Sequence, residues 1–309
     1  MNKNSIFGIN CGFLSGILWG LDTVLTGIVL SMAPFIEGAK AISIAPIVSA
    51  LLHDTFSSIW MMIFSLIKGE LVKTIKLIKT RSGKFICIGA ILGGPVGMAA
   101  YLIAINFIGP GYTASISAIY PVVGALLSYL LLKEKLNVRR WVGLIISVIA
   151  IVILGYIPQT NTSNKFIIGF ICAIVCVLGW ALESVICAYG MKNNEITPTQ
   201  ALQIRQIVSA LFYSLIIVPS VAGLELTKIV IVTNALPIFI GVSLIGTLSY
   251  IFYYIAIDKI GSVKATGLNI TYSIWAIVFE IIFLGNPITI KLIISAILIT
   301  IGSVLVSKN

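Results

Sequence analysis

Two acidic side chains stand inside apolar stretches of the sequence, each three residues after a tryptophan. GILWGLDTVLTG (16–27) contains Trp19 and Asp22, and GWALESV (179–185) contains Trp180 and Glu183. Residues three apart share a helix face. An indole face attracts a cation, and a carboxylate adds full Coulomb attraction where the dielectric constant is low. The two pairs predict a site for a positively charged ligand. The alternative is that the tryptophans fill space while the acids pair with Arg205 or serines.

Further aromatic residues at helical spacing extend this candidate site. Tyr250, Tyr253 and Tyr254 form one stripe with hydroxyl groups. A second stripe consists of Asn269, Tyr272 and Trp275. Such stripes also occur in ordinary helix cores, which is the alternative interpretation. The complete set of candidate substrate-binding residues is Trp19, Asp22, Tyr120, Trp180, Glu183, Tyr250, Asn269, Tyr272 and Trp275.

Ionisable residues inside apolar segments are functional candidates by default because their burial is costly. His53-Asp54 and Arg205-Gln206 lie in two such segments. One interpretation makes Asp54 or Asp22 a proton-coupling group with Arg205 as its charge partner. The other makes these residues structural hydrogen-bonding groups. The candidate coupling or gating residues are His53, Asp54, Arg205, Gln206 and Tyr253.

The composition is that of a membrane protein. Of the 309 residues 59% are hydrophobic and 10% are charged, whereas soluble domains carry about 25% charged residues. A helix crosses a bilayer with about 20 apolar residues. The sequence therefore predicts an all-α integral membrane protein, its apolar N-terminal run retained as the first span. The ten expected spans are 6–31, 42–67, 85–108, 112–133, 140–157, 165–190, 199–223, 232–257, 264–285 and 289–306.

The net charge of +10 is distributed unevenly between the two expected sides of the membrane. With ten spans, one side collects 15 basic residues and the other collects four, which are Lys40, Lys165, Lys228 and Lys291. Cytoplasmic loops are enriched in Lys and Arg. Both termini are therefore expected in the cytoplasm, and no nucleic-acid partner is expected.

An internal repeat organises the chain. At a shift of 152 residues, YLIAINFIG (101–109) aligns with YYIAIDKIG (253–261) with six of nine positions identical. The first spans align at a shift of 161, which places Trp19 on Trp180 and Asp22 on Glu183. The expected units are residues 1–157 and 158–309, each with five helices. Because five is odd, the second unit enters the membrane from the opposite side, as in many secondary transporters.

Glycines and prolines within the spans predict local features. Gly89, Gly93 and Gly97 repeat at intervals of four and predict a close helix–helix approach. Prolines inside spans are expected to bend or loosen helices. The prolines concerned are Pro46, Pro95, Pro121 and Pro237.

Other site chemistries have little support in the sequence. The five cysteines all fall within expected spans and the chain has a single histidine, so no metal site is expected. The sequence shows no glycine-rich phosphate loop with lysine and no nucleophile elbow. Neither an enzyme activity nor a cofactor is expected.

The chain resembles the EamA branch of the drug/metabolite transporter (DMT) superfamily over essentially its whole length. The resemblance lies in FLSGILWG, SAIYPVVGALLSYLLLKEKL and KATGLNITYSIWAIVFEIIFLG. Within that branch it is most similar to the LicB-type bacterial choline permeases. The motifs that carry this similarity are GPVGM (94–98), SAIYP (117–121), WALESV (180–185), IRQ (204–206), SYIFYYIAI (249–257) and KATGLN (264–269), together with His53-Asp54.

The resemblance implies import of choline or a related quaternary amine by alternating access, through an aromatic cage assisted by one acid. Trp19, Trp180, Glu183 and Tyr250 match the positions expected to hold the ligand. Asp22 stands where those permeases often have a small residue, which leaves open a second charge, a proton site or a different substrate. The implied location is the cytoplasmic membrane of a bacterium, as a monomer or homodimer.

Two other transport classes and one non-transport class remain as alternatives. Many EamA relatives export amino acids or other metabolites, and a multidrug cation/proton antiporter would use the same acids. A membrane scaffold or sensor would leave the embedded acids unexplained. In each transport class the membrane potential or a proton gradient would supply the energy.

Overall fold

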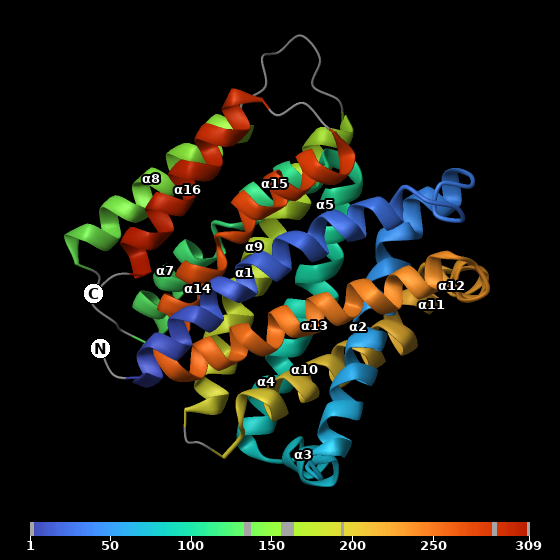
Figure 1. Ribbon diagram of the computed structural model, residues 1–309, viewed down its shortest axis with the longest axis horizontal. Helices are drawn as coiled ribbons and strands as arrows, with labels where there is room; N and C mark the ends of the chain where they lie inside the picture. The colour runs from blue at the N-terminus through green and yellow to red at the C-terminus, as the bar shows by residue number, and fades with distance from the viewer. Residues whose placement is uncertain (1–2, 133–136, 156–163, 193–194, 286–288, 308–309) are drawn as a thin grey trace.

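The computed structural model describes residues 3–132, 137–155, 164–192, 195–285 and 289–307, and the described residues form helices without strands (Figure 1). The helices of the first part are α1 (Lys3–Leu30), α2 (Ala39–Ile67), α3 (Leu71–Leu77), α4 (Arg81–Ile91), the π-helix η1 (Leu92–Met98), α5 (Ala99–Ile108), α6 (Pro110–Ser117), α7 (Tyr120–Leu132) and α8 (Val138–Gly155). Those of the second part are α9 (Asn164–Met191), α10 (Pro198–Phe212), the π-helix η2 (Tyr213–Ile217), α11 (Val218–Ser220), α12 (Leu224–Ile231), α13 (Ala235–Ile260), α14 (Ser262–Asn269), α15 (Tyr272–Leu284) and α16 (Ile290–Ser307).

The described residues include seven helical segments long and apolar enough to cross a membrane. They correspond to seven of the ten expected spans. The multi-pass, all-helical membrane architecture is therefore confirmed, and the number ten stays a prediction. The remaining expected spans fall on the helix pair α6–α7, on α8 and on α16, of which Ile290–Gly302 is a shorter apolar stretch.

Two expected spans are interrupted rather than continuous. Residues 112–133 are divided between α6 and α7, and residues 264–285 are divided between α14 and α15. Each short first helix follows a glycine with a positive φ, Gly109 at 80° and Gly261 at 83°, a conformation that favours glycine. Hydropathy did not reveal these breaks because the apolar character continues through them.

The helix bounds recur along the chain at the spacings found in the sequence. The bounds of α6, α7 and α8 coincide with those of α14, α15 and α16 after a shift of 152 residues, and α1 coincides with α9 after a shift of 161. The packing recurs as well. Helix α1 packs along α13 and α15, and α9 packs along α4, η1, α5 and α7. Helices α8 and α16 lie side by side (Figure 1).

Glycines allow α9 to approach the third expected span closely, as predicted. A Cβ atom at Gly89 would lie 2.7 Å from the Cys187 sulfur, and one at Gly97 would lie 2.8 Å from Trp180. Gly93, between them, faces Glu183. Because a methyl group has no room there, these glycines set the distance between α9 and the η1 region.

The four prolines differ in how they affect their spans. Pro95 lies in η1, where the helix is widened to the π form. Pro121 and Pro237 lie in the first turns of α7 and α13, where proline lacks an amide that would be unpaired anyway. The expected span 112–133 is nevertheless interrupted directly before Pro121, whereas α13 continues without a break beyond Pro237. Pro46 lies inside α2, which stays α-helical through it.

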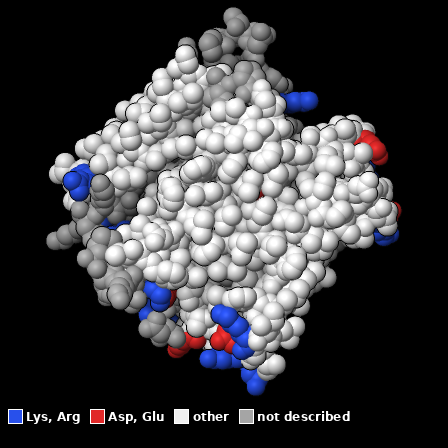
Figure 2. Space-filling model, viewed as in Figure 1, with Lys and Arg blue, Asp and Glu red and all other residues white. Residues whose placement is uncertain are grey.

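The outer surface suits a lipid environment. Large aliphatic side chains are exposed along many helices, including Leu66, Ile145, Leu215 and Ile282. In Figure 2 the charged side chains lie around the edge of the molecule, and its broad central face is almost entirely uncharged.

Candidate functional site

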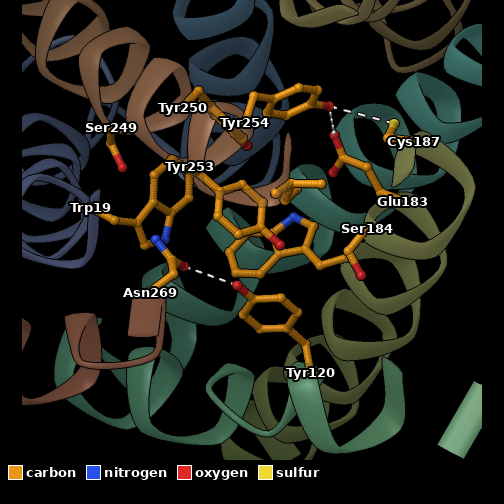
Figure 3. Close-up of a pocket in the computed structure, with 12 residues that line it drawn as sticks. Trp19, Tyr120, Glu183, Ser184, Cys187, Ser249, Tyr250, Tyr253, Tyr254 and Asn269 are labelled. Atoms are coloured by element: carbon orange, nitrogen blue, oxygen red, sulfur yellow. Dashed lines mark hydrogen bonds between the residues drawn. The ribbon is translucent and has the colours of Figure 1, made fainter. Parts of the chain in front are cut away.

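A small pocket lies near the middle of the helix bundle, where α1, α7, α9, α13 and α14 meet (Figure 3). Its open space measures about 30 Å³, which holds one or two water molecules. The lining residues are Trp19, Tyr120, Trp180, Glu183, Ser184, Cys187, Ser249, Tyr250, Tyr253, Tyr254, Ile257 and Asn269.

Aromatic rings form the walls of the pocket and pack against one another. Trp19 stands edge-on to Trp180 and to Tyr250, with ring centres 5.5 Å and 5.0 Å apart. Tyr120 meets the other side of Trp180 at 5.9 Å. Tyr101 packs behind this group, 4.7 Å from Trp180. The rings come from helices of both halves of the chain, and all of them are buried.

The two ends of the pocket differ in chemistry. Glu183 lies at one end, where Tyr254 donates a hydrogen bond of 3.1 Å to it, with Cys187 beside them (Figure 3). At the other end Tyr120 donates a hydrogen bond of 2.9 Å to the Asn269 amide oxygen. The pocket therefore has a carboxylate at one end, aromatic rings in the middle and neutral polar groups at the other end.

Arg205 is fully buried behind the carboxylate end and contacts four partners. Its Nε donates to Glu183 Oε1 at 3.0 Å, and its Nη1 donates to Asp54 at 3.2 Å. Its Nη2 donates to the Tyr250 hydroxyl, and the guanidinium carbon lies 4.6 Å from the centre of the Tyr250 ring. Gln206 accepts a further hydrogen bond from Nη1. One residue of α10 thus connects the pocket to Asp54 of α2.

A second pair of an acidic and a basic side chain, Asp22 and His53, lies beside the pair of Glu183 and Arg205. His53 Nε2 lies 3.0 Å from Asp22 Oδ1, and His53 Nδ1 lies 3.5 Å from Asp54 Oδ1. Ser209 donates a hydrogen bond to Asp54. The buried cluster of Asp22, His53, Asp54, Glu183 and Arg205 therefore holds three carboxyl groups against one guanidinium and one imidazole. With the carboxyl groups ionised, its net charge is −1 when His53 is protonated and −2 when it is neutral.

Glycines, which lack a side chain, leave room for the buried polar cluster. A Cβ atom at Gly246 would lie 2.6 Å from His53 Nε2 and 2.8 Å from Asp22 Oδ1. Gly94, its counterpart at the shift of 152, faces Ser209 and Asp54, and Gly93 faces the Glu183 carboxylate. The third expected span of each half thus leaves room for polar groups of the neighbouring helices.

Six of the nine candidate substrate-binding residues line this pocket: Trp19, Tyr120, Trp180, Glu183, Tyr250 and Asn269. Three do not. Asp22 pairs with His53, and the Tyr272 hydroxyl lies 2.6 Å from Ser117 Oγ. Trp275 packs against Phe13 and Phe279. Of the candidate coupling residues, Tyr253 lines the pocket, while His53, Asp54, Arg205 and Gln206 belong to the polar cluster behind it.

Several residues in or beside the pocket were missing from the list of candidate binding residues, although Tyr254 belonged to the aromatic stripe recognised in the sequence. Tyr254 follows Tyr250 by four residues and Cys187 follows Glu183 by four, so helical spacing carried a signal for both. Tyr101 corresponds to Tyr253 at the shift of 152. Ser184, Ser249 and Ile257 had no comparable signal. Among the described residues, no group of three or more His, Cys, Asp or Glu side chains is placed to hold a metal ion.

Comparison with known proteins now identifies the family. The sequence model of the EamA-like transporter family matches the chain twice, over residues 6–156 and 167–308. The chain belongs to the EamA-like transporter family. The family assignment agrees with a polytopic bundle whose ionisable groups are buried around a central pocket.

Curated relatives of this EamA-like transporter cover most of its length. It is 33% identical over 280 residues to Protein LicB of Haemophilus influenzae, with 90% of each chain covered. It is 22% identical to the uncharacterized transporter YoaV of Bacillus subtilis, over 74% of this chain and 77% of that one. A solved crystal structure, 15% identical, superimposes with a TM-score of 0.63 over 99% of this chain and 97% of that one, and supports the fold.

Proposed function

We propose that this EamA-like transporter imports choline or a related quaternary ammonium compound by alternating access. The observation that carries the proposal is the aromatic pocket with Glu183 at its edge, next to a buried cluster that holds three carboxyl groups and one guanidinium. A quaternary ammonium group cannot donate a conventional hydrogen bond, so ring faces and a carboxylate are the groups suited to hold it. The similarity to Protein LicB and the permease-like motifs support the same substrate class.

The binding pose follows from the polarity of the pocket. The trimethylammonium head would lie among Trp19, Trp180 and Tyr250, with Glu183 balancing its charge. The hydroxyl group would reach Asn269, at the opposite end. Because the open space is about 30 Å³, the head fits only after the rings move apart. The structure therefore corresponds to a closed pocket, and ligand entry requires displacement of the helices that carry the rings.

Arg205 contacts the same side chains that a substrate cation would contact. It pairs with Glu183 and stacks on Tyr250 in the same arrangement that would hold an ammonium group. Asp54 and Gln206 offer the guanidinium a second set of partners. Substrate binding would shift Arg205 toward Asp54. Glu183 would then exchange its ion pair with Arg205 for an ion pair with the transported cation.

Two inverted units, residues 1–157 and 158–309, would provide the rocking motion. The recurring helix bounds and the two matches of the family model support this division. So does the reciprocal packing, in which each first helix lies against the third expected span of the other unit. Movement of one unit against the other would open the pocket to alternate sides.

The membrane potential favours entry of a cation. In the proposed orientation both termini lie in the cytoplasm of a bacterial cell. A negative-inside potential contributes about 2.3 kcal/mol per unit charge for each 100 mV, which corresponds to roughly fiftyfold accumulation. Asp22, His53 and Asp54 could couple the cycle to protons, because they bind exchangeable protons and connect to the pocket through Arg205.

A flux assay tests the transport proposal. Purified protein in liposomes should take up labelled choline when a potassium gradient with valinomycin makes the interior negative. Uptake should fall in the Glu183→Gln variant to the level of protein-free liposomes. Lack of uptake under either polarity of voltage, with amino-acid flux present, would overturn it.

A cation/proton antiporter is the second candidate. The observation that favours it is the number of buried acids. A monovalent substrate requires one carboxylate, and the cluster also contains Asp22 and Asp54. It predicts that an inward proton gradient drives loss of preloaded large flat cations. Export of amino acids is less favoured, because the only buried guanidinium of the described cluster is already paired with two carboxylates.

A further inference from the structure

A second cavity of about 480 Å³ lies on the outside of the bundle between α2, α3 and α10. We call it the α2–α3–α10 groove. It is open to the surroundings, and its largest lining side chains are Ile59, Met62, Ile75, Ile78, Ile207 and Leu211. Ile59, Ile75 and Leu211 are 41%, 50% and 51% exposed. None of its lining residues is acidic or aromatic, so the groove does not duplicate the central pocket.

Basic residues border the end of the groove formed by α3. Lys76 and Lys79 each follow a groove residue in the chain, and Lys73 precedes Ile75 by two positions. Residues 68–84 contain six basic side chains and one acid, Glu70. The six basic residues are exposed, and no carboxylate within the described residues forms an ion pair with them. Figure 2 shows basic side chains at the edge where Figure 1 places α3.

We propose that the α2–α3–α10 groove is a binding site for an anionic phospholipid. An acyl chain would fill the apolar groove, and the phosphate-bearing head group would contact Lys73, Lys76 and Lys79. The charge of the rim selects a lipid with net negative charge over a zwitterionic one, because juxtamembrane lysines each favour anionic lipid by roughly fivefold in affinity. A groove contacts an acyl chain on more sides than a flat helix face does, which adds dispersion contacts.

The position of the groove connects the lipid to the candidate transport site. Thr55 follows Asp54 in the chain, and Ile207 follows Gln206. Ala210 follows Ser209, which donates a hydrogen bond to Asp54. The walls of the groove therefore come from the same segments of α2 and α10 that carry the buried cluster. A bound lipid would stabilise the spacing of α2 and α10, and thus the ion pair between them.

The test compares lipids and variants in detergent solution. Native mass spectrometry would count retained lipids, and thermal unfolding would report stabilisation, with added phosphatidylglycerol or with phosphatidylethanolamine of the same chains. Glycerol 3-phosphate alone would test for binding of a free phosphate. The rim variant is K73Q/K76Q/K79Q, the groove variant is A210W, and the matched charge control is K40Q/K165Q/K291Q.

Wild-type protein and the charge control should retain phosphatidylglycerol in preference to phosphatidylethanolamine. The rim variant should lose roughly a hundredfold in affinity for it, and A210W should retain neither lipid in the groove while still binding choline. Equal retention of both lipids by wild type, or unchanged preference in the rim variant, would overturn the proposal. So would dissociation of a dimer by A210W, which would assign the groove to a second copy, or equal stabilisation by glycerol 3-phosphate.

Discussion

The Arg205 guanidinium lies 3.0 Å from the Glu183 carboxylate, and both side chains are buried at the edge of the central pocket. His53 and Asp22 lie at the same separation of 3.0 Å. In each case the basic side chain stands on the second expected span of a half and the acid on the first. Asp54 contacts both basic side chains. The two pairs therefore form one buried network with more acids than permanent cations.

Loss of Glu183 should weaken cation binding more than loss of Asp22. Opposite unit charges 4 Å apart interact by about 4 kcal/mol at an effective dielectric constant of 20, and losing half of that weakens binding roughly thirtyfold. Glu183→Gln should therefore raise the Kd for choline by at least that factor in calorimetry. Asp22→Asn is the matched control, since Asp22 does not line the pocket. Equal effects of the two substitutions would contradict the assignment.

Trp180 should contribute to binding, and Trp275 should not. A cation over an indole face gains about 0.5–2 kcal/mol, so Trp180→Leu should weaken choline binding between twofold and thirtyfold. Trp275→Leu removes a ring that packs only outside the pocket, against Phe13 and Phe279. The same titration applied to both variants measures the difference. An unchanged Kd in Trp180→Leu would argue against the cage.

Gly93 should tolerate no methyl group. A Cβ atom there collides with the Glu183 carboxylate, whereas one at Gly241 meets nothing within 4 Å. Gly93→Ala should therefore displace Glu183 and reduce choline affinity at least tenfold. Gly241→Ala should leave affinity unchanged and stabilise α13 by up to about 1 kcal/mol, because alanine is the better helix former. Thermal unfolding and calorimetry of both variants would check this, and wild-type affinity in Gly93→Ala would refute it.

Asp22 and His53 should be energetically coupled. Removing either partner leaves the other buried without its main contact, so Asp22→Asn and His53→Gln should each lower stability. The double variant should lose less than the sum, by about 0.5–3 kcal/mol. A double-mutant cycle in chemical denaturation measures this coupling. Additive losses would show that the 3.0 Å contact contributes no stability of its own.

The chain's helical spacing predicted much of the pocket. Trp180 and Glu183 share a face at i,i+3, as do Tyr250 and Tyr253, and the structure places all four around one space. Composition likewise predicted a helical membrane protein. Both inferences rest on local periodicity and hydropathy, which a single sequence contains.

The sequence offered Arg205 as one possible partner of the acids, but it did not show which acids Arg205 meets or that His53 meets Asp22. That Asp22 faces His53 depends on how α1 packs beside α2, and the Arg205 contact with Asp54 joins positions 151 residues apart. The breaks after α6 and α14 were also hidden, because residues such as Ile119 and Ile270 keep the segment apolar. Periodicity assigns a face to each helix, while helix–helix packing decides what that face meets.

The central claim is that the pocket recognises positive charge rather than shape. Choline and 3,3-dimethyl-1-butanol have the same size and hydroxyl group, but carbon replaces nitrogen in the second molecule and removes the charge. Calorimetric titration of the purified protein with both compounds tests the claim most directly. We expect saturable binding of choline, with affinity for the neutral analogue at least thirtyfold weaker. Equal affinity for the two compounds, or no binding of choline by protein that binds an amino acid, would contradict it.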